Sequence, residues 1–73
     1  MFSVVIGTID RAKTFNSILC KFDGDVDVKQ GRYNIDGKSI MGLFALNLMS
    51  PIIVSAHGDE ASLIEECREK NIL

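Results

Sequence analysis

The chain has 73 residues, of which 8 are basic and 10 are acidic, and its formal net charge is −2. This length fits a single domain over residues 1–73 and leaves no room for a second. Proteins that bind nucleic acid usually present a basic stripe, which a mildly acidic chain lacks, so we expect no nucleic-acid partner.

Cysteine and histidine are too few and too widely spaced to predict a metal site. The chain has two cysteines, Cys20 and Cys67, and one histidine, His57, without the paired spacing that zinc needs. A disulfide between the cysteines is arithmetically allowed, but disulfides are rare in the cytosol, which favours two free thiols. No signal peptide is visible, and no apolar run is long enough to cross a bilayer. We therefore expect a cytoplasmic domain that has no cofactor and no membrane contact.

Two periodicities follow one another in the first third of the chain. Apolar residues alternate with others over residues 2–6, which predicts a short strand with one buried face. From Asp10 to Phe22 the apolar residues recur every three or four positions, which predicts an amphipathic helix with Arg11 turned outward. Thr8 or Asp10 should cap this helix, because either side chain can accept a hydrogen bond from a free backbone amide.

Strict alternation returns in the middle of the chain. Residues 25–29 and 32–36 each place charged or polar side chains on one face and apolar ones, such as Tyr33 and Ile35, on the other. Gly31 lies between the two segments and can adopt a positive φ at no steric cost, so we predict two strands joined by a tight hairpin. One charged face is typical of an antiparallel sheet that is covered on one side only.

The second half of the chain repeats the change of period. Apolar spacing over residues 40–48 predicts a short helix capped by Ser39, and alternation over residues 51–57 predicts a fourth strand. The pair Gly58-Asp59 then turns the chain into a final helix. The residues expected on the buried face of that helix are Ala61, Leu63, Ile64 and Cys67.

The predicted order of elements is βαββαβα, which belongs to the α+β class. It implies an open-faced β-sandwich, in which three helices cover one face of a four-stranded antiparallel sheet. We expect the last strand to lie between the first two. One core should join the layers, and its expected members are Phe15, Leu19, Val28, Ile35, Val54 and Ile64.

Three segments resemble the phosphocarrier protein HPr of the bacterial phosphoenolpyruvate:sugar phosphotransferase system. They are residues 21–26 (Lys-Phe-Asp-Gly-Asp-Val), 37–43 (Gly-Lys-Ser-Ile-Met-Gly-Leu) and 56–60 (Ala-His-Gly-Asp-Glu). The resemblance covers roughly residues 13–70, and its most specific part is the Lys-Ser-Ile-Met-Gly run. It implies the open-faced βαββαβα sandwich of the HPr-like family, which is also the fold that the periodicity predicts.

The start of the first helix departs from the HPr pattern. HPr carries a phosphoryl group on a histidine in a Gly-x-His-x-Arg-Pro-like motif, and the spacing places that histidine near Thr8. The segment Gly7–Ala12 contains neither histidine nor proline, and Arg11 is what remains of the motif, displaced by one residue. A threonine phosphoester is too stable to relay its phosphoryl group, and no neighbouring base activates the hydroxyl. We therefore expect no phosphocarrier activity through a histidine, and a capping role for Thr8 or Asp10.

Ser39 matches the regulatory serine that an ATP-dependent kinase phosphorylates in HPr proteins of Gram-positive bacteria. A phosphate there adds about −1.5 to −2 charges at a helix start. A plain N-cap is the alternative role, and both roles can coexist. The resemblance also implies a docking surface for partner proteins on the residues that follow. Of these, we expect Ile40 and Met41 to be exposed, and Leu43 and Phe44 to belong to the core.

These features predict a regulatory or adaptor domain that acts by binding another protein and not as an enzyme. The expected partner is a protein of the phosphotransferase system or of carbon regulation, or the serine kinase itself. Two alternatives stay open: an atypical phosphotransferase component whose acceptor is not histidine, and a small-molecule or assembly module that kept only the fold. The sequence does not predict the oligomeric state.

Overall fold

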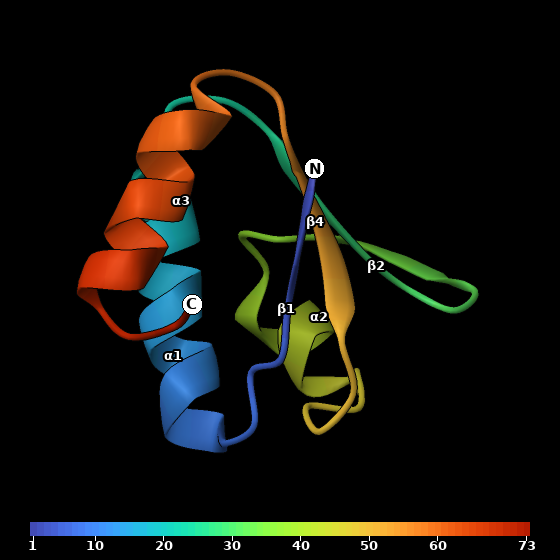
Figure 1. The fold of residues 1–73 in the computed structure, drawn as a ribbon. Helices are drawn as coiled ribbons and strands as arrows, with labels where there is room; N and C mark the ends of the chain where they lie inside the picture. The colour runs from blue at the N-terminus through green and yellow to red at the C-terminus, as the bar shows by residue number, and fades with distance from the viewer.

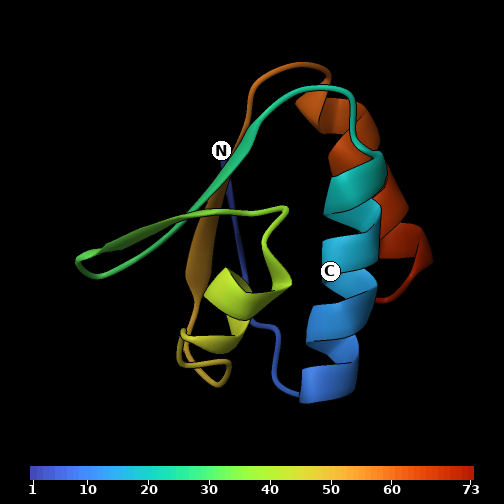
Figure 2. The same cartoon turned by 180° about the vertical axis from the view of Figure 1, so that it is seen from behind.

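The alternating segments form strands and the helical-period segments form helices, in the predicted order. In the computed structural model, which describes residues 1–73, the elements are β1 (Phe2–Val4), α1 (Ile9–Lys21), β2 (Val26–Gln30), β3 (Tyr33–Asp36), α2 (Ile40–Phe44), β4 (Ile52–Ala56) and α3 (Glu60–Glu69). The helices α1 and α3 lie side by side on one side of the sheet (Figures 1 and 2), and α2 packs against α1 and β3. No helix has the length and apolar character needed to cross a membrane.

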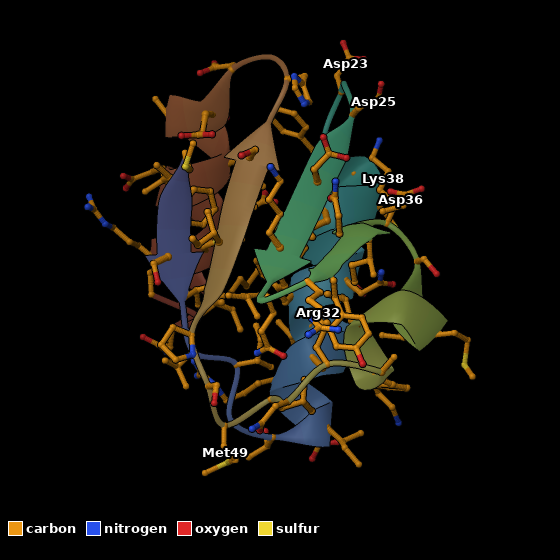
Figure 3. All side chains as sticks on the ribbon, turned by 90° about the vertical axis from the view of Figure 1, so that its right-hand side faces the viewer. Asp23, Asp25, Arg32, Asp36, Lys38 and Met49 are labelled. Carbon is orange, nitrogen blue, oxygen red and sulfur yellow. The ribbon has the colours of Figure 1, made fainter.

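The four strands form one antiparallel sheet in the order β1-β4-β2-β3. The predicted place of β4 between the first two strands is therefore confirmed. Val54 of β4 lies opposite Phe2 of β1 and opposite Val28 of β2. A two-residue turn, Gly31-Arg32, joins β2 to β3, and Gly31 has the positive φ (57°) that a tight hairpin turn requires. Figure 3 shows the opposite face of the sheet, with the helices behind it.

One hydrophobic core lies between the sheet and the helices. It contains 15 buried residues, among them Phe15 and Leu19 of α1, Val28 of β2 and Val54 of β4. Ile35 of β3 is half-buried and packs against this cluster. The predicted core is confirmed for these five residues.

Two predictions about burial are wrong. On α3, Ile64 is half-buried and Ala61 is exposed, because this helix buries a narrower face that is centred on Leu63 and Cys67. On β3, Tyr33 shares the helix-side parity of the strand but is 61% exposed. The tip of the β2–β3 hairpin extends beyond the helices (Figure 1), so no helix covers this side chain.

The second helix is shorter than the predicted segment 40–48 and spans Ile40–Phe44. Asn47 favours a turn after it, because its Oδ1 accepts the backbone N–H of Met49 at 3.0 Å. The amide side chain of Gln30 also holds the backbone N–H and C=O of Asn47, each at 2.8 Å. Asparagine side chains that bond to nearby amides compete with the helical ladder. The loop after α2 is therefore fixed by β2.

Both cysteines are free thiols, in contrasting surroundings. Cys20 is exposed on α1, whereas Cys67 is fully buried on α3. Burial, with a smaller contribution from Glu66, raises the pKa of Cys67 to about 11. At neutral pH Cys67 is therefore an uncharged residue of the core.

Truncation of Leu19 to alanine should lower the free energy of unfolding by about 2–5 kcal/mol, because it leaves a cavity in the packed core. Ile64→Ala is the matched control, and its half-buried side chain predicts a smaller loss. Urea denaturation followed by circular dichroism measures both values. Equal losses for the two variants would contradict the core described above.

Candidate functional site

The three segments that resemble HPr meet at one end of the molecule. A Cβ atom at Gly24 would lie 2.2 Å from the carbonyl oxygen of His57, and its φ of 129° also favours glycine. The backbone N–H of His57 donates to the carbonyl of Asp25 at 2.8 Å. From the segment 37–43, Lys38 Nζ donates to the carbonyl of Phe22 at 2.9 Å. Asp25 and Lys38 lie together at this end (Figure 3). Much of the shared sequence is therefore explained by packing.

Thr8 caps α1, which confirms one of the two predicted caps. Its hydroxyl accepts the backbone N–H of Arg11 at 3.1 Å, and Asp10 lies exposed in the first helical turn. This turn contains no histidine. His57 follows β4, and its Nε2 lies 3.0 Å from Oδ2 of Asp27.

Arg11 was predicted to turn outward into solvent, and this prediction is wrong. Its guanidinium donates to the carbonyl of Ile6 at 2.5 Å, of Asn71 at 2.6 Å and of Ile72 at 3.1 Å. The arginine therefore joins the loop before α1 to the turn after α3. Guanidinium presents several donors in a fixed plane, which suits a set of convergent carbonyls. Arg11 is thus a structural clamp, and each of its three nitrogens already donates to a backbone carbonyl.

Ser39 caps α2, as predicted, and remains exposed. Its Oγ accepts the backbone N–H of Gly42 at 3.3 Å. The neighbouring Lys38 does not pair with Ser39. Its ammonium donates to the carbonyl of Phe22, and its backbone N–H donates to Oδ1 of Asp36 at 3.0 Å. The serine hydroxyl is therefore accessible, without an ammonium group paired to it.

The residues after Ser39 divide between core and surface. Leu43 is 1% exposed and Ile40 is half-buried against the core, whereas Met41 is 73% and Phe44 36% exposed. The predictions are confirmed for Met41 and Leu43, and they are wrong for Ile40 and Phe44. In a helix, positions three apart share a face, so Ile40 and Leu43 turn inward together while Met41 and Phe44 turn outward. We call the exposed pair, Met41 and Phe44, the α2 surface.

Sequence reasoning missed a second exposed apolar pair, Ile9 and Met49. Ile9 is 59% exposed and Met49 is 73% exposed. The backbone N–H of Gly7 donates to the carbonyl of Leu48 at 2.7 Å, which joins the two segments that carry them. Met49 lies at the end of the molecule where α1 begins (Figure 3). The only sequence signal for this pair is that neither residue fits the apolar period of its segment.

Two open hollows are present, and neither is lined by Ser39 or by the α2 surface. The first lies between α1 and α3 and is lined by Ile18, Lys21, Phe22, Asp23, Gly58, Asp59, Ser62, Leu63 and Glu66. The second is lined by Asp25, Val26, Asp27, Asp36 and His57. No group of three or more His, Cys, Asp or Glu side chains has the arrangement to hold a metal ion. The exposed side chains of the α2 surface are apolar and suit non-covalent contact with another protein.

The comparisons with known proteins support the fold. No protein-family model matches the chain, and no curated protein matches it either. Among solved structures, the crystal structure of HPr-C-His from Thermoanaerobacter tengcongensis superposes with a TM-score of 0.77. The match has 22% sequence identity and covers 93% of this chain and 85% of that one. The chain has an HPr-like fold.

Replacement of Arg11 by methionine should lower the free energy of unfolding by about 2 kcal/mol, because hydrogen bonds from a charged donor are lost and carbonyls are left unpaired. Arg11→Lys should recover little of the loss, since an ammonium group cannot reach the convergent carbonyls as a fork. Lys13→Met, at an exposed position of the same helix, is the control. Urea denaturation measures all three, and an unchanged midpoint for Arg11→Met would contradict the clamp.

Proposed function

We propose that this chain is a regulatory or adaptor domain that binds a partner protein through the α2 surface. The observation that best supports this is the exposure of Met41 and Phe44 beside the accessible cap Ser39. Leu43 anchors the helix in the core, so the backbone that carries the two exposed side chains is held in place before binding. Methionine and aromatic residues are enriched at the centres of protein interfaces, and methionine adapts to varied partners.

The fold suggests which partners to test. The likeness to HPr favours a protein of the sugar phosphotransferase system or of carbon regulation, and the Lys38–Gly42 run includes Met41 of the α2 surface. We propose that the domain acts without a carrier histidine. The first turn of α1 holds Thr8, Ile9 and Asp10, and the guanidinium of Arg11 is engaged by carbonyls.

Titration of the labelled domain with the HPr-binding proteins of its host tests the docking surface. Met41→Asp should raise the dissociation constant of a bound partner by roughly tenfold or more, because it places a charge in an apolar contact. Met49→Asp is the matched control, since Met49 has the same exposure as Met41, 73%, and lies outside the α2 surface. The chemical-shift changes that the partner causes in nuclear magnetic resonance spectra of the domain should map to α2. A complex that Met49→Asp weakens and Met41→Asp leaves unchanged would contradict the proposal.

The same proteins separate binding from phosphocarrier activity. With the general phosphotransfer enzyme and labelled phosphoenolpyruvate, the domain should take up no phosphoryl group. Stoichiometric label that is lost in acid and kept in base would mark a phosphohistidine, which only His57 can supply. That result, abolished in His57→Ala, would contradict the proposal that the domain acts without a carrier histidine. Stoichiometric label on another residue would instead favour the atypical phosphotransferase whose acceptor is not histidine.

We further propose that an HPr-type serine kinase phosphorylates Ser39. Because the side chain is exposed at the start of α2, the added charge should leave the fold intact and change partner binding beside Met41. Intact mass spectrometry after incubation with kinase and ATP should show one phosphate on the wild type and none on Ser39→Ala. That variant should also lose about 1 kcal/mol of stability with the cap. Ser62→Ala, on α3, is the control, and a phosphate that persists in Ser39→Ala would contradict the assignment.

A further inference from the structure

The outer edge of β3 has free backbone groups. Gly37 N–H donates to the carbonyl of Val26 at 2.8 Å, which fixes this pair as hydrogen-bonded. Hydrogen-bonded and non-hydrogen-bonded pairs alternate along an antiparallel ladder, so the N–H and C=O groups of Asn34 and Asp36 point away from β2. Of these groups, the Asp36 carbonyl already accepts the backbone N–H of Ser39 at 3.0 Å. Asn34 is exposed and takes part in no hydrogen bond outside the sheet ladder. Such an edge can accept another strand.

The same edge carries charges that the chain does not pair. Asp36 lies directly opposite Asp27 on the open face of the sheet, and like charges in this arrangement repel. Asp27 has His57 as a partner, but no cationic side chain pairs with Asp36. Arg32, in the turn before β3, is exposed and forms no hydrogen bond or ion pair. Figure 3 shows Arg32 and Asp36 toward opposite ends of this edge.

The spacing of these two residues matches an antiparallel pairing of the edge with itself. Arg32 precedes Asn34 by two residues, and Asp36 follows it by two. When Asn34 of one copy lies opposite Asn34 of another, Arg32 of each copy lies opposite Asp36 of the other. A two-fold axis forms this contact twice. The outward N–H and C=O groups of the two Asn34 residues then bond to each other.

We propose that two copies of this chain pair through their β3 edges, antiparallel and with Asn34 at the two-fold axis, to form one continuous sheet. The charges select this occupant, because the edge is positive at one end and negative at the other and is therefore complementary to itself. The pairing also brings a cation to the Asp27–Asp36 pair, which lacks a strong one within the chain. A short strand buries little area, so the dimer is weak and forms at high concentration.

Sedimentation equilibrium of the full chain from micromolar to millimolar concentration tests the dimer. The mass should rise from that of one chain toward that of two, and added salt should oppose the rise because the ion pairs are exposed. Asn34→Pro should keep the chain monomeric, since it removes an outward N–H that β2 does not use. Circular dichroism should show that this variant is folded. A wild type that stays monomeric at every concentration overturns the proposal.

Charge reversal tests the register. Arg32→Glu and Asp36→Arg should each raise the dissociation constant by roughly tenfold or more, because each places two like-charged pairs across the axis. Their equimolar mixture should dimerise again, since Glu at 32 then meets Arg at 36 and the native pair meets as well. Circular dichroism spectra like that of the wild type show that both single variants are folded. A dimer insensitive to these reversals, or a mixture that stays monomeric, overturns this interface.

Discussion

The insertion of β4 between β1 and β2 is the constraint on which the rest of the structure depends. β1 has no other neighbour in the sheet, so it is placed only when residues 52–56 have paired with it. The start of α1 follows β1, and its position is set by the same event. Contacts between distant parts of the chain also fix the first turn of α1, because Arg11 in that turn donates to the carbonyls of Asn71 and Ile72. The position of the first turn of α1 therefore depends on tertiary contacts.

The strands and α1 were predictable because one repeating rule governs them. A strand with one covered face needs alternation, and Val26 and Val28 of β2 and Ile52 and Val54 of β4 are all buried on that rule. The rule does not predict burial correctly where the helices no longer pack on the sheet. Tyr33 has the correct parity for burial, but it lies at a hairpin tip that the helices do not reach. Alternation predicts which face of the sheet a side chain lies on, but it does not predict whether a helix covers that face.

Single side chains in the candidate site were harder to predict than elements. Arg11 was expected on the outward face of an amphipathic helix, but two of its carbonyl partners come from residues 60 and 61 positions further along the chain. Phe44 was expected in the core because it is apolar, but a helix of five residues has only one inward face, which Ile40 and Leu43 fill. In both cases the apolar spacing of the segment indicated the wrong side, because it carries no information on where the helix ends or on distant backbone carbonyls. The caps at Thr8 and Ser39 were predictable because they depend on neighbouring amides alone.

The α2 surface and the β3 edge are joined by one turn, and this links the two proposals. The backbone N–H of Ser39 donates to the carbonyl of Asp36 at 3.0 Å, so a group added to Ser39 lies one turn from the Asp36 carboxylate. A phosphate at Ser39 adds negative charge to the end of the edge that already holds Asp27 and Asp36. Because an added anion strengthens attraction to a nearby cation, it favours the approach of Arg32 from a second copy. The same charge sits beside Met41 and disfavours an apolar partner there. If both proposals hold, phosphorylation of Ser39 would oppose docking on α2 and support pairing on β3, so the two surfaces would respond to it in opposite directions.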